Sequence, residues 1–177
     1  MPIHPISPVF DEHSQILILG SFPSVQSRAQ GFFYGHPQNR FWRVLAAVMQ
    51  DAPPCTVAER RAFLLRHRIA VWDVIASCDI VGSSDAKIRN AEVNDLSPIL
   101  SAAPIQQIFV NGQTAARLYH RWTEPLIHRP AIPLPSTSPA NATWSLERLV
   151  EAWRIIRLDA GRTDAPVQTR QKGSSTP

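Results

Sequence analysis

Residues 16–42 have the sequence ILILGSFPSVQSRAQGFFYGHPQNRFW. The stretch starts with a run of isoleucine and leucine that ends at Gly20, a pattern typical of a central strand buried on both faces. A loop of polar and aromatic residues follows, and its composition is too specific for a simple connection. Loops that follow the strands commonly hold the binding and catalytic residues of α/β proteins. This stretch therefore indicates both the fold class and the place of a functional site.

Strand-like and helix-like segments alternate along the rest of the chain. Short apolar runs predict further strands at 69–76, 106–112 and 126–135. Helical patterns occupy 40–50, 56–67, 97–104, 113–122 and 143–158. This alternation predicts a parallel sheet between layers of helices, with ligands at the carboxyl ends of the strands. The loops that reach that edge are 20–40, 76–97 and 134–142.

Local signals mark two helix starts and one long loop. Asn39 is suited to cap the helix that follows it, because its side chain can accept a hydrogen bond from a free backbone N–H. Thr56 and Glu59 have the spacing of a capping box. Residues 79–97 are polar and contain glycine and asparagine, so we predict a long surface loop there.

The size and charge of the chain suit one intracellular domain. The chain has 177 residues, of which 44% are hydrophobic, enough to bury a core without disulfide bonds or a structural metal. We predict a single α/β domain over residues 1–158 and a disordered tail over 159–177, which is polar and rich in Gly, Pro, Ser and Thr. A formal charge of +4 suits a DNA-binding protein without requiring one.

Metal, disulfide and membrane chemistry have little support in the sequence. Cys55 and Cys78 show no zinc-binding spacing, and the chain does not have the four cysteines that an iron–sulfur cluster takes. The N-terminus has no basic region followed by an apolar core, and no apolar run approaches the ~20 residues of a membrane span. We expect a cytoplasmic monomer that uses no metal or cofactor.

Two motifs resemble those of a known family. GSFPS at 20–24 and GHPQNRFW at 35–42 resemble the first motif of the uracil-DNA glycosylase superfamily, and most closely that of its deoxyinosine (hypoxanthine) DNA glycosylase branch. LPSTSPANA at 134–142 resembles the second motif, a loop that compresses the phosphate backbone of DNA. The resemblance spans about residues 15–158. It implies a three-layer α/β/α sandwich with a central four-stranded parallel sheet, and a reaction on a base turned out of the DNA stack.

The resemblance also implies a catalytic residue. Most of the superfamily has Asp or Asn where this chain has Phe22, and in the deoxyinosine branch the candidate moves to the position of Asn39. An amide is no base at neutral pH, so Asn39 would align water and hydrogen-bond the sugar or base, and a slow enzyme is expected. From spacing alone, helix capping is the better explanation of Asn39, and only the resemblance favours the catalytic role. Asp73 is the reserve catalyst, and Asp85 is a further acid near the second loop.

Other residues of these loops are candidates for holding the base and the DNA backbone. The base-binding candidates are Phe22, Phe33 and Tyr34, which could stack on a purine, and His36 and Asn111, which could hydrogen-bond it. The candidates for contact with DNA phosphates are Ser21, Ser136, Thr137, Ser138 and Asn141. Each has a structural alternative, namely loop packing for the aromatics and turn or helix-start formation for the polar residues.

The predicted activity is hydrolysis of the bond between hypoxanthine and its sugar in DNA. Leu134 stands where several branches of the superfamily have a histidine that stabilises a leaving uracil anion, which favours a purine leaving group. Neither motif contains a lysine for a Schiff-base step, so a monofunctional enzyme is expected. One alternative is a mismatch-specific uracil glycosylase, since HPxNRFW resembles that group too. The other is a non-catalytic DNA-binding protein of the same fold.

Overall fold

A four-stranded parallel sheet forms the centre of the protein. The computed structural model describes residues 5–80 and 88–160, and its sheet has the strand order β2-β1-β5-β6. These strands are β1 (Ile16–Gly20), β2 (Ile69–Asp73), β5 (Gln107–Asn111) and β6 (Ala131–Leu134). All neighbouring pairs run parallel. The predicted central sheet is confirmed. All five residues of β1 are buried because β1 is an inner strand with helices on both faces.

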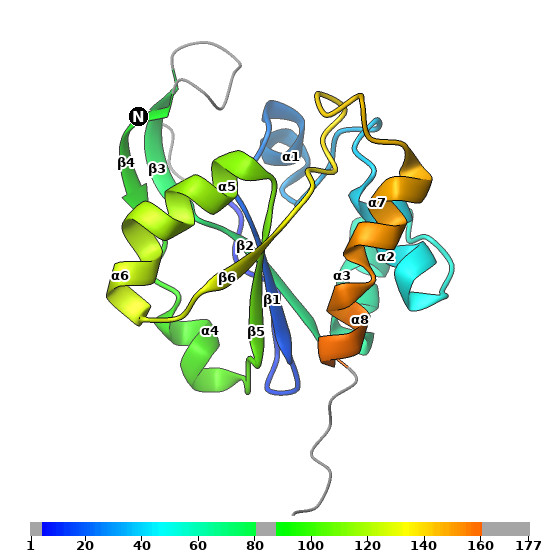
Figure 1. Cartoon of the computed structure of the whole chain (residues 1–177), viewed down its shortest axis with the longest axis horizontal. Coiled ribbons are helices and arrows are strands. Elements are labelled where there is room, and N and C mark those ends of the chain that lie inside the picture. The colour runs from blue at the N-terminus through cyan, green and yellow to red at the C-terminus, as the bar shows by residue number, and fades with distance from the viewer. Residues whose placement is uncertain (1–4, 81–87, 161–177) are drawn as a thin grey trace, which may run out of the picture.

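Helices cover both faces of the sheet (Figure 1). On one face lie α2 (Phe41–Met49), α3 (Val57–Arg66), α7 (Leu146–Trp153) and α8 (Ile155–Ala160). On the other lie α4 (Ser97–Ala102), α5 (Gln113–Leu118), η2 (Tyr119–Thr123) and α6 (Glu124–Ile127). Side chains alternate along β1, and each face of the sheet has its own hydrophobic core. Ile16 and Ile18 enter the core beneath α2, α3 and α7, while Leu17 and Leu19 enter the core beneath α4 and α5. The predicted α/β/α sandwich is confirmed.

The start of α2 differs from the prediction by one residue. The cap position is Arg40, whose own side chain does not bond the helix end, and the helix begins at Phe41. Asn39 still serves this end, because its Oδ1 accepts a hydrogen bond from the Phe41 N–H at 3.0 Å. The predicted capping box at Thr56 and Glu59 is confirmed at the start of α3.

The second predicted strand ends earlier than expected, and the predicted loop after it contains further strands. β2 stops at Asp73, and β3 (Ile75–Ile80) then pairs antiparallel with β4 (Ile88–Val93). Asn94 stabilises the break because its Nδ2 donates to the carbonyl oxygens of Asp73 and Ile75. The prediction of a loop over 79–97 is therefore wrong for β4, whose residues IRNAEV are too polar to show an apolar run. Asp85 lies outside the described residues.

Three further helical segments differ from the predictions. The loop after β1 contains a short helix, α1 (Val25–Gln30), which starts at a Ser24 cap and ends at Gly31 with a φ of 68°. The helix predicted over 113–122 continues through η2 and α6 to residue 127. The final helix is interrupted at Arg154 and forms α7 and α8. Most of the predicted tail, 161–177, lies outside the described residues.

We expect the Ile18→Ala substitution to lower the free energy of unfolding by about 2–5 kcal/mol, because Ile18 is fully buried between the sheet and the helices. Val25→Ala is the control, since Val25 is 70% exposed. It should change the free energy by no more than about 0.5 kcal/mol. Urea unfolding measures both. Similar losses for the two variants would contradict the burial of Ile18 in the core on its side of the sheet.

Candidate active site

The carboxyl edge of the sheet brings the predicted site residues together. Gly20 pairs with Asp73, and Asn111 pairs with Leu134, so these four residues end their strands side by side. From β1 the chain crosses to β2 on one side, and from β5 it crosses to β6 on the other. In open α/β sheets ligands bind in a crevice at such a reversal, outside the carboxyl ends of the strands. We therefore call the region at the ends of β1 and β5 the crevice. α1 and the loop between β6 and α7 lie at this same end (Figure 1).

Two polar side chains converge on Gly20. A Cβ atom placed on Gly20 would lie 2.4 Å from Asp73 Oδ1 and 3.0 Å from the Tyr34 hydroxyl oxygen. No side chain larger than hydrogen fits there without moving the carboxylate. The lack of a side chain at position 20 thus allows Asp73 and Tyr34 to approach each other at the crevice. In the sequence, Gly20 indicated only the end of a strand.

Tyr34 is held by its neighbours but keeps a protonated hydroxyl. Its backbone has a φ of 51°, its ring stacks on Phe41 at 3.8 Å between centroids, and its carbonyl oxygen accepts a hydrogen bond from Trp42 Nε1. The buried hydroxyl makes no hydrogen bond of standard geometry within the described part of the chain. Burial and then the charge of Asp73 raise the pKa of Tyr34 well above its usual value, while Asn111 lowers it by less. The hydroxyl of Tyr34 therefore keeps its proton.

Thr137 links the two motif loops. Its hydroxyl donates to Asn39 Oδ1 at 2.9 Å and accepts from Asn111 Nδ2 at 3.0 Å. Its backbone N–H donates to Asn111 Oδ1 at 3.1 Å, and its carbonyl oxygen accepts from the Arg40 N–H at 3.0 Å. Thr137 is fully buried, so these bonds hold Asn39 beside the end of β5.

Arg40 fixes the second motif loop from the other side. Its guanidinium donates to the carbonyl oxygens of Ser138, Asn141 and Trp144. Guanidinium groups suit this role because they have five donors in a fixed plane. Sequence analysis missed this contact, since the local pattern around Arg40 does not reveal partners about a hundred positions away. The resemblance of HPQNRFW to a family motif was the one signal that pointed to the residue.

The aromatic candidates occupy different environments. Phe33 is 2% exposed and lies in the core, in edge contact with Phe32 at 5.7 Å between ring centroids. Its ring has no free face for a base, so the structure corrects its predicted role to packing. Phe22 is half-buried, and the guanidinium of Arg28 lies 5.7 Å from its ring centroid. His36 is half-buried, and its Nδ1 accepts from the Gln38 N–H, which leaves Nε2 to donate.

Residues of the loop after β6 divide into buried and accessible groups. Thr137 acts inside the protein and not on phosphate, because it is fully buried, which corrects the prediction. Ser136 and Ser138 are half-buried, and each hydroxyl oxygen accepts from a backbone N–H two residues ahead, which leaves its proton to donate. Asn141 supports the loop through Nδ2, which donates to the Ser136 carbonyl oxygen. Ser21, at the end of β1, is half-buried, and its carbonyl oxygen accepts from the Ile75 N–H.

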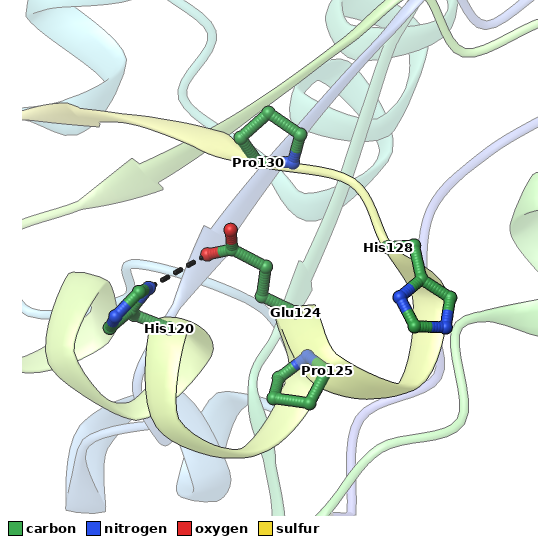
Figure 2. A pocket seen from close by; sticks show the side chains of 5 residues that line it. All are labelled: His120, Glu124, Pro125, His128 and Pro130. Atoms are coloured by element: carbon green, nitrogen blue, oxygen red, sulfur yellow. Dashed lines mark hydrogen bonds and ion pairs between the residues drawn. The ribbon is translucent and has the colours of Figure 1, made fainter.

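Figure 2 shows an open pocket elsewhere, lined by His120, Glu124, Pro125, His128 and Pro130. His120 Nδ1 lies 2.9 Å from a Glu124 carboxylate oxygen, but the His120 side chain is 82% exposed. Such a solvated pair contributes little to stability. None of the predicted site residues lines this pocket, so the carboxyl edge of the sheet remains the candidate active site. Among residues 5–80 and 88–160, no cluster of three His, Cys, Asp or Glu side chains is placed to bind a metal.

Comparison with known proteins identifies the family. The family model described as the uracil DNA glycosylase superfamily matches residues 7–157. The chain belongs to this superfamily. The resemblance of the two motif loops is therefore confirmed, and the loops that carry them are the ones that Thr137 joins. Within the described part of the chain, no helix has both the length and the apolar character needed to cross a bilayer.

Relatives cover most of the chain. A Methanosarcina acetivorans protein named Hypoxanthine DNA glycosylase is 35% identical over 153 residues, which are 84% of this chain and 93% of the relative. A Methanosarcina barkeri protein of the same name is 37% identical over 108 residues, 60% of this chain and 68% of the relative. The solution NMR structure of a candidate uracil DNA glycosylase from Methanosarcina acetivorans has a TM-score of 0.72 and 30% identity, and covers 86% of this chain and 96% of its own.

We expect Arg40→Lys to lower the free energy of unfolding by about 1–3 kcal/mol, because the ammonium is one point and does not span the carbonyl oxygens that the two separate terminal nitrogens of the guanidinium reach. Arg43→Lys is the matched control, since Arg43 is exposed on the same helix. It should change the value by less than about 0.5 kcal/mol. Urea unfolding of both variants measures the difference, and equal effects would contradict the role of Arg40 in the loop.

Proposed function

We propose that the protein is a monofunctional DNA glycosylase that removes hypoxanthine from deoxyinosine in DNA and leaves an abasic site. The observation that carries this proposal is the position of Asn39, held by Thr137 at the crevice between β1 and β5. Two relatives named Hypoxanthine DNA glycosylase support the choice of base. Phe22 supports it too, because it stands where most of the superfamily has Asp or Asn.

The proposed reaction breaks the bond between the base and C1′ of the sugar. The electron pair of that bond goes to the base, the oxygen of water bonds to C1′, and a proton of the water ends on the base. The sugar passes through an oxocarbenium-like state, so the enzyme must stabilise a departing base and a cationic sugar together. An amide takes no proton at neutral pH, and Asn39 therefore acts by hydrogen bonding alone.

The residues around Asn39 are suited to bind the extruded base and the phosphate backbone of DNA. We propose Phe22 and Tyr34 as the aromatic contacts of the extruded base, and His36 as a donor to it through Nε2. Asn111 supports Thr137 with both polar atoms of its side chain. Ser21, Ser136, Ser138 and Asn141 are the proposed contacts with the phosphate backbone.

We expect purified protein to generate alkali-labile sites in a labelled duplex that carries one deoxyinosine. Asn39→Ala should lower the single-turnover rate by about 100- to 1,000-fold, the usual effect of removing one preorganised hydrogen-bonding group from a site of this kind. Gln26→Ala, which removes an exposed side-chain amide from α1, is the control and should keep the wild-type rate. Strand breaks after alkali treatment measure the activity.

The alternatives give different results in the same assay. Breaks in a duplex with deoxyuridine opposite guanine, and none at deoxyinosine, would assign the protein to the mismatch-specific uracil glycosylases. DNA binding that weakens with salt, without breaks at either base, would favour a non-catalytic DNA-binding protein. Breaks at deoxyinosine that Asn39→Ala leaves unchanged would keep the activity but remove Asn39 from it.

We also propose that the enzyme works as a monomer in the cytoplasm. Its proposed substrate is DNA, and the exposed Cys55 forms no disulfide bond, as expected where thiols stay reduced. Light scattering coupled to gel filtration tests the oligomeric state.

A further inference from the structure

We infer that Asn39 takes part in the reaction as a hydrogen-bond donor, through Nδ2, and that Thr137 is the positioning residue that fixes it in this orientation. The inference rests on the proposed function and deepens it. It assigns the direction of the hydrogen bond that Asn39 offers to substrate, and it excludes Oδ1 from holding the attacking water. The argument starts from two backbone N–H groups whose role is unambiguous.

Those two backbone groups fix the orientation of both amides. The Phe41 N–H lies 3.0 Å from one terminal atom of the Asn39 side chain, and the Thr137 N–H lies 3.1 Å from one of Asn111. A backbone N–H can only donate, so each of these side-chain atoms must be the oxygen. The amide orientation of Asn39 and of Asn111 therefore follows from chemistry, which is not true of an amide that faces only hydroxyls or water.

The proton of the Thr137 hydroxyl then has one place to go. Asn111 Nδ2 donates to Thr137 Oγ1 at 3.0 Å, so this contact uses a lone pair of the hydroxyl and not its proton. The other neighbour of the hydroxyl is Asn39 Oδ1 at 2.9 Å, an acceptor, and the proton must point to it. Thr137 is fully buried, so bulk water does not compete for this proton.

Asn39 Oδ1 is thus occupied on both sides. One lone pair accepts from the Phe41 N–H and the other from the Thr137 hydroxyl. Within residues 5–80 and 88–160, the Nδ2 group of Asn39 has no protein partner, and the residue is half-buried at the crevice. The group offered to a ligand is therefore an NH₂ with two donor hydrogens.

A donor at this position suits the departing base. As the bond to C1′ breaks, negative charge builds on the ring nitrogens and oxygen of hypoxanthine, and a hydrogen bond from Nδ2 strengthens with that charge. An attacking water needs an acceptor for its proton instead, and Asn39 has no free acceptor. Asn39 therefore lowers the barrier through the leaving group. Because the oxygen of the amide is held by Thr137 and Phe41, the NH₂ needs no reorganisation when the charge develops.

The first test replaces the donor with an acceptor. Asn39→Asp keeps an oxygen for the Phe41 N–H and the Thr137 hydroxyl, but puts a second oxygen where Nδ2 was. We expect its single-turnover rate on the deoxyinosine duplex, at saturating enzyme, to fall at least as far as that of Asn39→Ala, about 100-fold or more. A rate at or above that of the wild type, rising as the carboxyl group ionises, would show that the residue activates water and would overturn the inference.

The second test asks whether Thr137 acts through Asn39. Thr137→Val keeps the shape of the side chain and removes the hydroxyl, and Thr137→Ser restores the hydroxyl. We expect Val to lower the single-turnover rate about 10-fold or more with little change in the Kd for DNA, and Ser to recover most of the loss. In the Asn39→Ala background, Val should have almost no further effect, because a positioning residue has nothing left to position.

These measurements separate the possible failures. A Thr137→Val effect of the same size with and without Asn39 would show a general structural role and overturn the positioning role. Equal rates for Val and Ser would do the same. A wild-type protein that excises hypoxanthine while Asn39→Asp stays fully active would overturn the donor role and leave the proposed function intact. A wild-type protein that binds DNA but excises no base would overturn both.

Discussion

The buried hydroxyl of Thr137 is the contact on which the site depends, because it joins two loops whose bonded residues are 98 positions apart. The loop after β1 supplies Asn39, and the loop after β6 supplies Thr137. Arg40 closes the same contact from the other direction by binding carbonyl oxygens of the second loop. A buried hydroxyl without partners costs about 1–3 kcal/mol of free energy. Displacement of either loop would therefore lower the stability of the protein. The position of Asn39 is therefore a property of both motifs together.

The sequence predicted the elements whose signal is local, and missed those that depend on distant partners. β1 was predictable because both of its faces are apolar, and the α3 capping box because Thr56 and Glu59 lie three positions apart. β4 was missed because strand IRNAEV has a polar face, and Phe33 was assigned to the base because an aromatic in a polar loop does not reveal which way it points. The directions of the hydrogen bonds at Thr137 were beyond prediction, since they need the three-dimensional neighbours.

In this account a hydrogen-bond donor, the NH₂ group of Asn39, meets the charge of the departing base, and donors stabilise such negative charge. Burial and the charge of Asp73 raise the pKa of Tyr34, so its buried hydroxyl stays protonated beside that carboxylate. Phe22 removes the Asp or Asn that most of the superfamily has at its position. The arrangement therefore favours a reaction in which the base leaves early and water is positioned less strongly.

The central claim is that Asn39 keeps its oxygen bonded inside the protein and presents its NH₂ group to the base. A crystal structure with a duplex that carries an uncleavable 2′-fluoro analogue of deoxyinosine tests this claim most directly. We predict that Asn39 Nδ2 lies within about 3.2 Å of an acceptor on the extruded base, while Oδ1 still accepts from Phe41 and Thr137. A structure in which Oδ1 leaves Thr137 and accepts a hydrogen bond from a water beside C1′ would contradict it.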